Sequence, residues 1–158
     1  VTQKRYKEMI KTKNYRNLML QLSGNKDKDK LIWKRINEIR KQYNMSEYSF
    51  HKDITKIRRH FSDNIDTFTA QKIATNLWKA YNKFFYGNGK EIHYKKYGTL
   101  NSLEGKSNKT GIRFKDNKIL WKGLKIPVII NYNNYYEYQA MQSDIVYCRI
   151  IRKYIRNK

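Results

Sequence analysis

The chain has 158 residues, of which 39% are hydrophobic and 15% aromatic, so it is too apolar for a disordered polymer and long enough to bury a core. Its 35 Lys and Arg residues outnumber 13 Asp and Glu residues and give a formal net charge of +22, an excess that requires a polyanionic partner. Nucleic acid is the expected partner, with an anionic membrane surface as the lesser alternative, and the single cysteine, Cys148, excludes a disulfide framework and a Cys-rich zinc site.

The first part of the chain repeats apolar side chains at helix spacing. Residues 1–22 are expected to be helical, with an interruption at residues 12–14. After a turn, Asp27 or Asp29 is the expected N-cap of a second helix, because an aspartate there accepts hydrogen bonds from the first free N–H groups.

A third helix is expected after Ser46 or Ser49, with an apolar stripe of Phe50, Ile54, Ile57 and Phe61. Its opposite face is basic and carries Lys52, Lys56, Arg58 and Arg59. A solvated face and a phosphate-binding face explain this pattern equally well.

A fourth helix is expected from Asp66 or Thr67 to Phe85. Its apolar stripe consists of Ala70, Ile73, Ala74, Leu77, Tyr81 and Phe84. Its polar face includes Gln71, Lys72, Thr75 and Asn76. Amide side chains can pair with adenine edges while lysines hold phosphates, although an ordinary solvated face is the better interpretation for any single residue there.

After residue 88 the pattern changes from helix to strand. Residues 91–97 alternate as in a strand, and Asp116-Asn117 lies between two short runs as a two-residue hairpin turn. Pairing across this turn places Phe114 opposite Ile119 and Ile112 opposite Trp121 on an apolar face. The other face carries Arg113, Lys115, Lys118 and Lys122.

Three further elements are expected after the hairpin. Residues 125–130 form an edge strand or a bulge, because Pro127 cannot donate to a ladder. A short helix follows at residues 135–141, and residues 144–155 form a long strand. Residues 156–158 resemble the turn of a hairpin whose second strand is missing. An unpaired edge of this length suggests that the chain is part of a longer polypeptide.

Known catalytic patterns are not found. Gly105-Lys106-Ser107 lacks the first glycine of a phosphate-binding loop, because position 100 is Leu. The three histidines are scattered, and the acidic residues have no recognisable two-metal spacing, so we expect no cofactor and place catalysis below binding. No apolar run is long enough to span a membrane and no signal peptide is found, which predicts a soluble, cytoplasmic protein.

Basic residues interleaved with aromatic residues remain as the candidate binding chemistry, since lysines hold a backbone and aromatic rings stack on bases. Phe114 and Trp121 are more simply explained as core. For the lysines binding is favoured, because Gly98, Gly105 and Gly111 permit close approach of backbone and phosphate. In this second half the candidates are Lys95, Lys96, Lys106, Lys109, Arg113, Lys115, Lys122, and the two arginines of the last strand, Arg149 and Arg152.

Three segments, FTAQKIATNLWKAYNKFFYGNGK, KKYGTLNSLEGKSNKTGIRFKDNKILWKGLKIPV and YCRIIRK, together resemble the transposon-encoded TnpB (OrfB-type) proteins. These are RNA-guided DNA endonucleases related to type V CRISPR effectors. The resemblance implies an α+β fold in which residues 1–86 form a helical recognition-like domain of about four helices and residues 88–158 form a partial antiparallel, wedge-like β-barrel. The acidic triad of the family's RuvC-type nuclease domain and its Cys-rich zinc module have no counterpart here, so the resemblance does not carry over cleavage.

The resemblance implies a nucleic-acid-binding segment of a TnpB-like transposon protein that holds a guide RNA scaffold and double-stranded target-flanking DNA without catalysis of its own. It also makes Gln71, Lys72, Thr75 and Asn76 candidate readers of the short motif beside the target. Two alternatives stay open: a nuclease-free, RNA-guided DNA-binding regulator, and a stand-alone basic nuclease.

Overall fold

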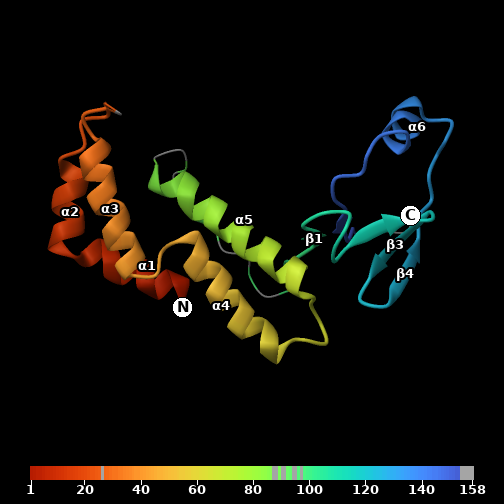
Figure 1. Ribbon diagram of the computed structural model, residues 1–158, viewed down its shortest axis with the longest axis horizontal. Coiled ribbons are helices and arrows are strands. Elements are labelled where there is room, and N and C mark those ends of the chain that lie inside the picture. Colours follow the sequence, from red (N-terminus) through yellow and green to blue (C-terminus); the bar gives the residue numbers. More distant parts are fainter. Residues whose placement is uncertain (26, 87–88, 90–91, 94–95, 97, 154–158) are drawn as a thin grey trace. The chain divides into compact units, whose positions relative to one another are not determined.

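The computed structural model (Figure 1) describes residues 1–25, 27–86, 89, 92–93, 96 and 98–153. The chain is α+β, as predicted, and divides into two compact units, Val1–Lys52 and Asp53–Lys158. The domain boundary predicted at residues 86–88 stays a prediction, because residues 87–88 lie outside the described part. The helices are α1 (Thr2–Lys11), α2 (Lys13–Leu20), α3 (Lys30–Gln42), α4 (Glu47–His60), α5 (Thr67–Phe85) and α6 (Tyr135–Met141).

The predicted interruption of the first helix is confirmed at Thr12. This residue is extended (φ −70°, ψ 135°) between α1 and α2, and its hydroxyl donates to the Met9 carbonyl at 2.7 Å. A β-branched residue that satisfies a terminal carbonyl in this way ends one helix and begins the next. The sequence break therefore becomes a bend between two short helices.

Asp29 is the N-cap of α3, as predicted, but its carboxylate has another role. It accepts from the Ser23 N–H and hydroxyl and from the Gly24 N–H, at 2.9–3.0 Å. The backbone hydrogen bond from Ser23 is the main reason that the pKa of Asp29 lies below its ordinary value. Asp29 thus fastens the preceding loop to the start of α3.

The core of the first unit is formed where its helices meet. Met9, Ile36 and Met45 are almost completely buried, and Tyr15 and Phe50 are nearly so. The predicted stripe of α4 is buried only at its start, because Ile57 and Phe61 near its end are exposed.

The N-terminus of α5 is fixed by Asp66, whose carboxylate accepts from the Phe68 and Thr69 N–H groups. This confirms the predicted cap. Of the predicted apolar stripe, Ala70, Ala74 and Tyr81 are buried, whereas Ile73 is exposed. The buried positions reflect where α5 packs, including its contact with strand β1 (Ser102–Glu104).

The predicted hairpin is confirmed in its register. Strands β2 (Arg113–Lys115) and β3 (Lys118–Trp121) are antiparallel, with Phe114 opposite Ile119. Asp116 and Asn117 have φ of 52° and 54°, as a type I′ turn requires. A second two-residue turn, Lys122-Gly123, was not predicted; it also has positive φ at both residues and leads into β4 (Leu124–Pro127).

Strand β4 is an edge strand, as Pro127 predicted, in a sheet of order β2-β3-β4. The tight turn makes Trp121 and Leu124 a hydrogen-bonded pair, so the alternation of an antiparallel ladder turns the polar backbone groups of Lys125 and Pro127 outward. Pro127 therefore costs no ladder hydrogen bond. A lysine and a proline on the open edge also oppose pairing with another strand.

The long strand predicted at residues 144–155 is wrong over most of its described length. Only β5 (Arg149–Ile151) is a strand, and it pairs with β1, which was not predicted. Because β1 has only three residues, it offers a ladder for only three partners. Among the described residues the two-stranded and three-stranded sheets do not close into a barrel. The strand predicted at residues 91–97 and the turn at 156–158 fall mostly or wholly outside the described residues.

Within the described ranges, no helix has the length and apolar character needed to cross a membrane.

Candidate nucleic-acid interface

A hollow of about 390 Å³ lies on the basic face of the hairpin. We call it the hairpin groove, and it is lined by Asn108, Lys109, Arg113, Phe114, Lys115 and Leu120. Three of the cations that the sequence nominated are therefore brought to one place.

Asn108 builds one wall of the hairpin groove by pairing with the outer edge of β2. Its side-chain oxygen accepts from the Phe114 N–H at 2.6 Å, and its side-chain nitrogen donates to the Phe114 carbonyl at 3.2 Å. The Asn108 N–H in turn donates to the Val146 carbonyl at 2.8 Å. These bonds complete the backbone pairing of Phe114 and hold Lys109 beside the strand.

The hairpin groove is basic without acidic compensation. No acidic side chain lines it, and among the described residues Lys109, Arg113 and Lys115 form no ion pair. Lys115 also lies directly opposite Lys118, a like-charge pair that opposes strand pairing unless an anion joins them. With Phe114 and Leu120 as apolar lining, the groove is suited to a phosphate backbone with its sugars.

A second cluster joins α5, β1 and β5 through Glu104. Its carboxylate binds Lys72 of α5 at 2.7 Å and also the guanidinium of Arg149. The Lys72 ammonium lies 5.3 Å from the centre of the Tyr147 ring, within cation–π range. The hydrogen bond from Lys72 is the main cause that lowers the pKa of Glu104, and Glu104 in turn raises the pKa of Arg149.

Two of the nominated cations in this Glu104 cluster are thus already paired within the chain. Beside them, Lys106 donates to the Gln71 side-chain oxygen at 3.0 Å, so the predicted reader face of α5 is also partly engaged. Thr75 is half-buried and Asn76 is exposed. The structure therefore brings Lys72 and Arg149 together around an acidic residue that the sequence did not nominate, and it pairs Lys106 with Gln71.

Trp121 has a structural role, although it is half-buried and does not belong to the buried core. Its half-buried indole donates to Asp66 at 2.7 Å, and the Thr69 hydroxyl donates to the same carboxylate oxygen at 2.5 Å. Lys122, in the adjacent turn, donates to the Ser62 carbonyl. These bonds fasten the hairpin to the start of α5.

Two of the three glycines nominated for close phosphate approach serve contacts within the chain, whereas a Cβ at Gly98 would meet no atom within 4 Å. A Cβ on buried Gly105 would lie 3.0 Å from the Ile112 carbonyl oxygen and 3.3 Å from that of Cys148. Gly111 has φ +71°, and a Cβ there would lie 3.0 Å from the Asp66 carboxylate. Both positions therefore allow the chain to pack against itself.

The remaining nominated cations are dispersed. Lys56 and Arg59 are exposed on α4, whereas the Arg58 side chain donates to the Ile65 carbonyl at 3.3 Å. Lys96 and Arg152 are exposed, and Lys95 lies outside the described residues.

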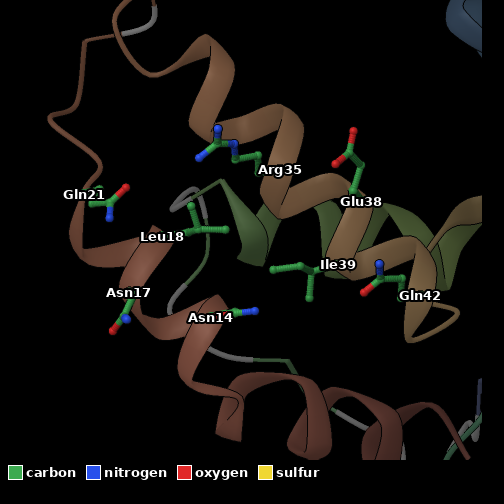
Figure 2. Close-up of a pocket in the computed structure, with 8 residues that line it drawn as sticks. All are labelled: Asn14, Asn17, Leu18, Gln21, Arg35, Glu38, Ile39 and Gln42. Atoms are coloured by element: carbon green, nitrogen blue, oxygen red, sulfur yellow. The ribbon is translucent and has the colours of Figure 1, made fainter.

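A separate groove of about 400 Å³ lies in the first unit between α2 and α3 (Figure 2). Leu18 and Ile39 point toward each other across it, and polar side chains surround them: Asn14, Asn17, Gln21, Arg35, Glu38 and Gln42. Sequence reasoning did not nominate this groove. The signal was the spacing of three and four residues between Asn14, Asn17 and the C-cap residue Gln21, which places the three amides on one side of α2.

No three His, Cys, Asp or Glu side chains of the described residues are grouped so that they could hold a metal ion. Comparisons with protein-family models, with curated proteins and with solved structures found no match for this chain.

Proposed function

We propose that this chain binds nucleic acid through the hairpin groove, and that it does so as a segment of a TnpB-like transposon protein. In this proposal it holds guide RNA and target-flanking DNA in the cytoplasm and performs no catalysis of its own. The observation that carries the proposal is the convergence of Lys109, Arg113 and Lys115 on one hollow that no acidic side chain lines.

The physical reasons favour a polyanion with repeated charges. Three cations close together repel one another, so the groove is most stable when phosphates lie between them. Arg113 can form a bidentate contact with a phosphate, whereas the lysines act as point charges. The formal net charge of +22 would also draw a nucleic acid to the chain from a distance.

The test compares two triple variants of equal charge change. Lys109→Gln/Arg113→Gln/Lys115→Gln removes the cations of the hairpin groove, and Lys28→Gln/Lys34→Gln/Lys41→Gln removes three exposed lysines of the first unit. Affinity for a labelled DNA duplex is measured by fluorescence anisotropy between 50 and 200 mM salt.

We expect the groove variant to weaken binding and to reduce the slope of log affinity against log salt by roughly 2.7, since each lost phosphate contact removes about 0.9. The control variant should change the slope by less than about 1. Equal changes in the two variants would show that the positive charge acts diffusely, and the proposal for the groove would be wrong.

A further inference from the structure

We propose that residues 131–142, which we call the tyrosine segment, stack on unpaired bases of a single-stranded nucleic acid. This inference rests on the proposed function, because it adds a binding surface for the bases of a nucleic acid whose phosphates are held by the hairpin groove. The sequence predicted a short helix at residues 135–141, but the tyrosines there were not among the nominated binding residues.

The exposure of the tyrosine segment is its first unusual property. Every side chain from residue 131 to 140 is exposed, and α6 buries none of its residues. Tyr136 is 81% exposed and Tyr135 is 68% exposed, with Tyr132 and Tyr138 at 54% and 45%. Large aromatic side chains gathered on one exposed segment indicate a binding surface.

The segment is nevertheless locally ordered. Asn134 caps α6 by accepting from the Tyr136 and Glu137 N–H groups, and Glu137 accepts from the Asn131 N–H at 2.8 Å. The Asn134 side chain also donates to Glu137 at 3.4 Å. The acidic side chain is therefore used to fix the loop to its helix, and the tyrosines are presented on a preorganised turn.

The rings have a geometry that leaves flat surfaces available. Tyr135 and Tyr136 lie 5.7 Å apart between ring centres and are inclined at 74°, edge to face. In such a pair the ring that presents its edge keeps both faces uncovered by its neighbour. A base can stack on such a face whatever its identity, because every base has a π-face.

The tyrosine segment differs from the hairpin groove in that it carries no cation. Residues 126–148 contain no Lys, Arg or His in a chain that has 35 Lys and Arg residues, so the tyrosine segment cannot hold phosphates by ion pairs. Cations resume at both ends, at Lys125 in β4 and at Arg149 in β5. Arg149 is already paired with Glu104, so a strand held at its backbone by Lys125 and the hairpin groove would present its bases to the tyrosines.

A second copy of the chain is the less favoured occupant. Two molecules that each carry a net charge of +22 repel one another, whereas a nucleic acid is attracted to both. Self-association through the tyrosine segment is therefore an outcome that the experiment must distinguish.

The experiment uses the double variant Tyr135→Ala/Tyr136→Ala, with Tyr48→Ala as a control because Tyr48 is 79% exposed on α4. Tyr135→Phe/Tyr136→Phe keeps the rings and removes only the hydroxyls. Anisotropy is measured with a labelled single-stranded RNA of mixed sequence and with a DNA duplex. Light scattering gives the mass of each variant.

We expect the double alanine variant to bind the single strand roughly tenfold more weakly or worse, with duplex affinity and salt slope unchanged. The phenylalanine variant and Tyr48→Ala should bind as the unsubstituted chain does. The inference would be overturned if the double alanine variant kept its salt-dependent affinity for the single strand. It would also be overturned if the variant lost affinity equally for both nucleic acids, or if the substitutions dissociated a dimer. If the affinity of the unsubstituted chain for nucleic acid does not depend on salt, the proposed function itself is contradicted.

Discussion

Asp66 is the residue on which the attachment of the hairpin to α5 depends. It accepts from two backbone N–H groups, from the Thr69 hydroxyl and from the Trp121 indole. We expect Asp66→Ala to destabilise the fold by about 2 kcal/mol, because it removes an N-cap and leaves buried donors unpaired. Urea unfolding measures this, with Asp63→Ala as the control in the preceding exposed loop. Equal effects of the two substitutions would contradict this role.

The same carboxylate predicts a pH dependence. Burial is the largest single influence on the pKa of Asp66 and acts to raise it, but the hydrogen bonds from Thr69, Trp121 and Phe68 together hold it below 3.8. The ionised form therefore stabilises the fold fully above about pH 3.8, and this contribution is lost as the pH falls through the lower pKa of the folded state. The stability difference between the unsubstituted chain and Asp66→Asn should shrink in acid, as urea unfolding at neutral and acidic pH would measure. A constant difference would contradict the assignment.

The substitution Gly105→Ala tests whether close packing requires the absence of a side chain at this position. A Cβ there would lie 3.0 Å from the Ile112 carbonyl oxygen, whereas at Gly89 the nearest atom would be 3.7 Å away, which is an ordinary contact. We expect Gly105→Ala to cost about 1–3 kcal/mol in thermal unfolding and Gly89→Ala to be nearly neutral. A neutral Gly105→Ala would show that the strands shift apart without cost.

At the scale of elements, Glu104 of β1 connects α5 and β5, because its carboxylate forms ion pairs with Lys72 and Arg149. We expect Glu104→Gln to lower stability by about 1 kcal/mol, because partly exposed ion pairs contribute modestly. It should also strengthen nucleic-acid binding and steepen the salt slope by up to about 1.8, since Lys72 and Arg149 become available to phosphates. Asp144→Asn, which changes charge equally at an exposed position, is the control for both measurements. Weaker binding in Glu104→Gln would mean that Glu104 positions the cations for binding.

Elements set by local chemistry were predictable from the sequence. The break at Thr12, the cap at Asp66, the turn at Asp116-Asn117 and the helix at residues 135–141 all follow from residues close in the chain. Strand β1 was missed because Ser102-Leu103-Glu104 is short and has no β-branched or aromatic residue. Strand β5 was overestimated for a different reason, since its apolar alternation extends beyond the three partner residues that β1 provides.

At the scale of the whole molecule, charge could be predicted from composition but its pairing could not. The sequence nominated Lys109, Arg113 and Lys115. Alternation along β2 places Arg113 and Lys115 on one face, and the Asn108–Phe114 hydrogen bonds hold Lys109 beside them. The sequence could not show that Lys72 and Arg149 share Glu104, because these residues are far apart in the chain. Arg149 reaches Glu104 through the pairing of β1 with β5, and Lys72 reaches it through the contact of α5 with β1. Long-range ion pairs of this kind depend on tertiary structure.

The central claim, that the chain binds nucleic acid through its phosphates, is tested most directly by the salt dependence of its affinity. The measurement is an anisotropy titration of the unsubstituted chain with a labelled duplex between 50 and 200 mM salt. If six to ten phosphates are contacted, we expect the affinity to fall by roughly 10³–10⁵ over this range. An affinity that stays constant would contradict the account.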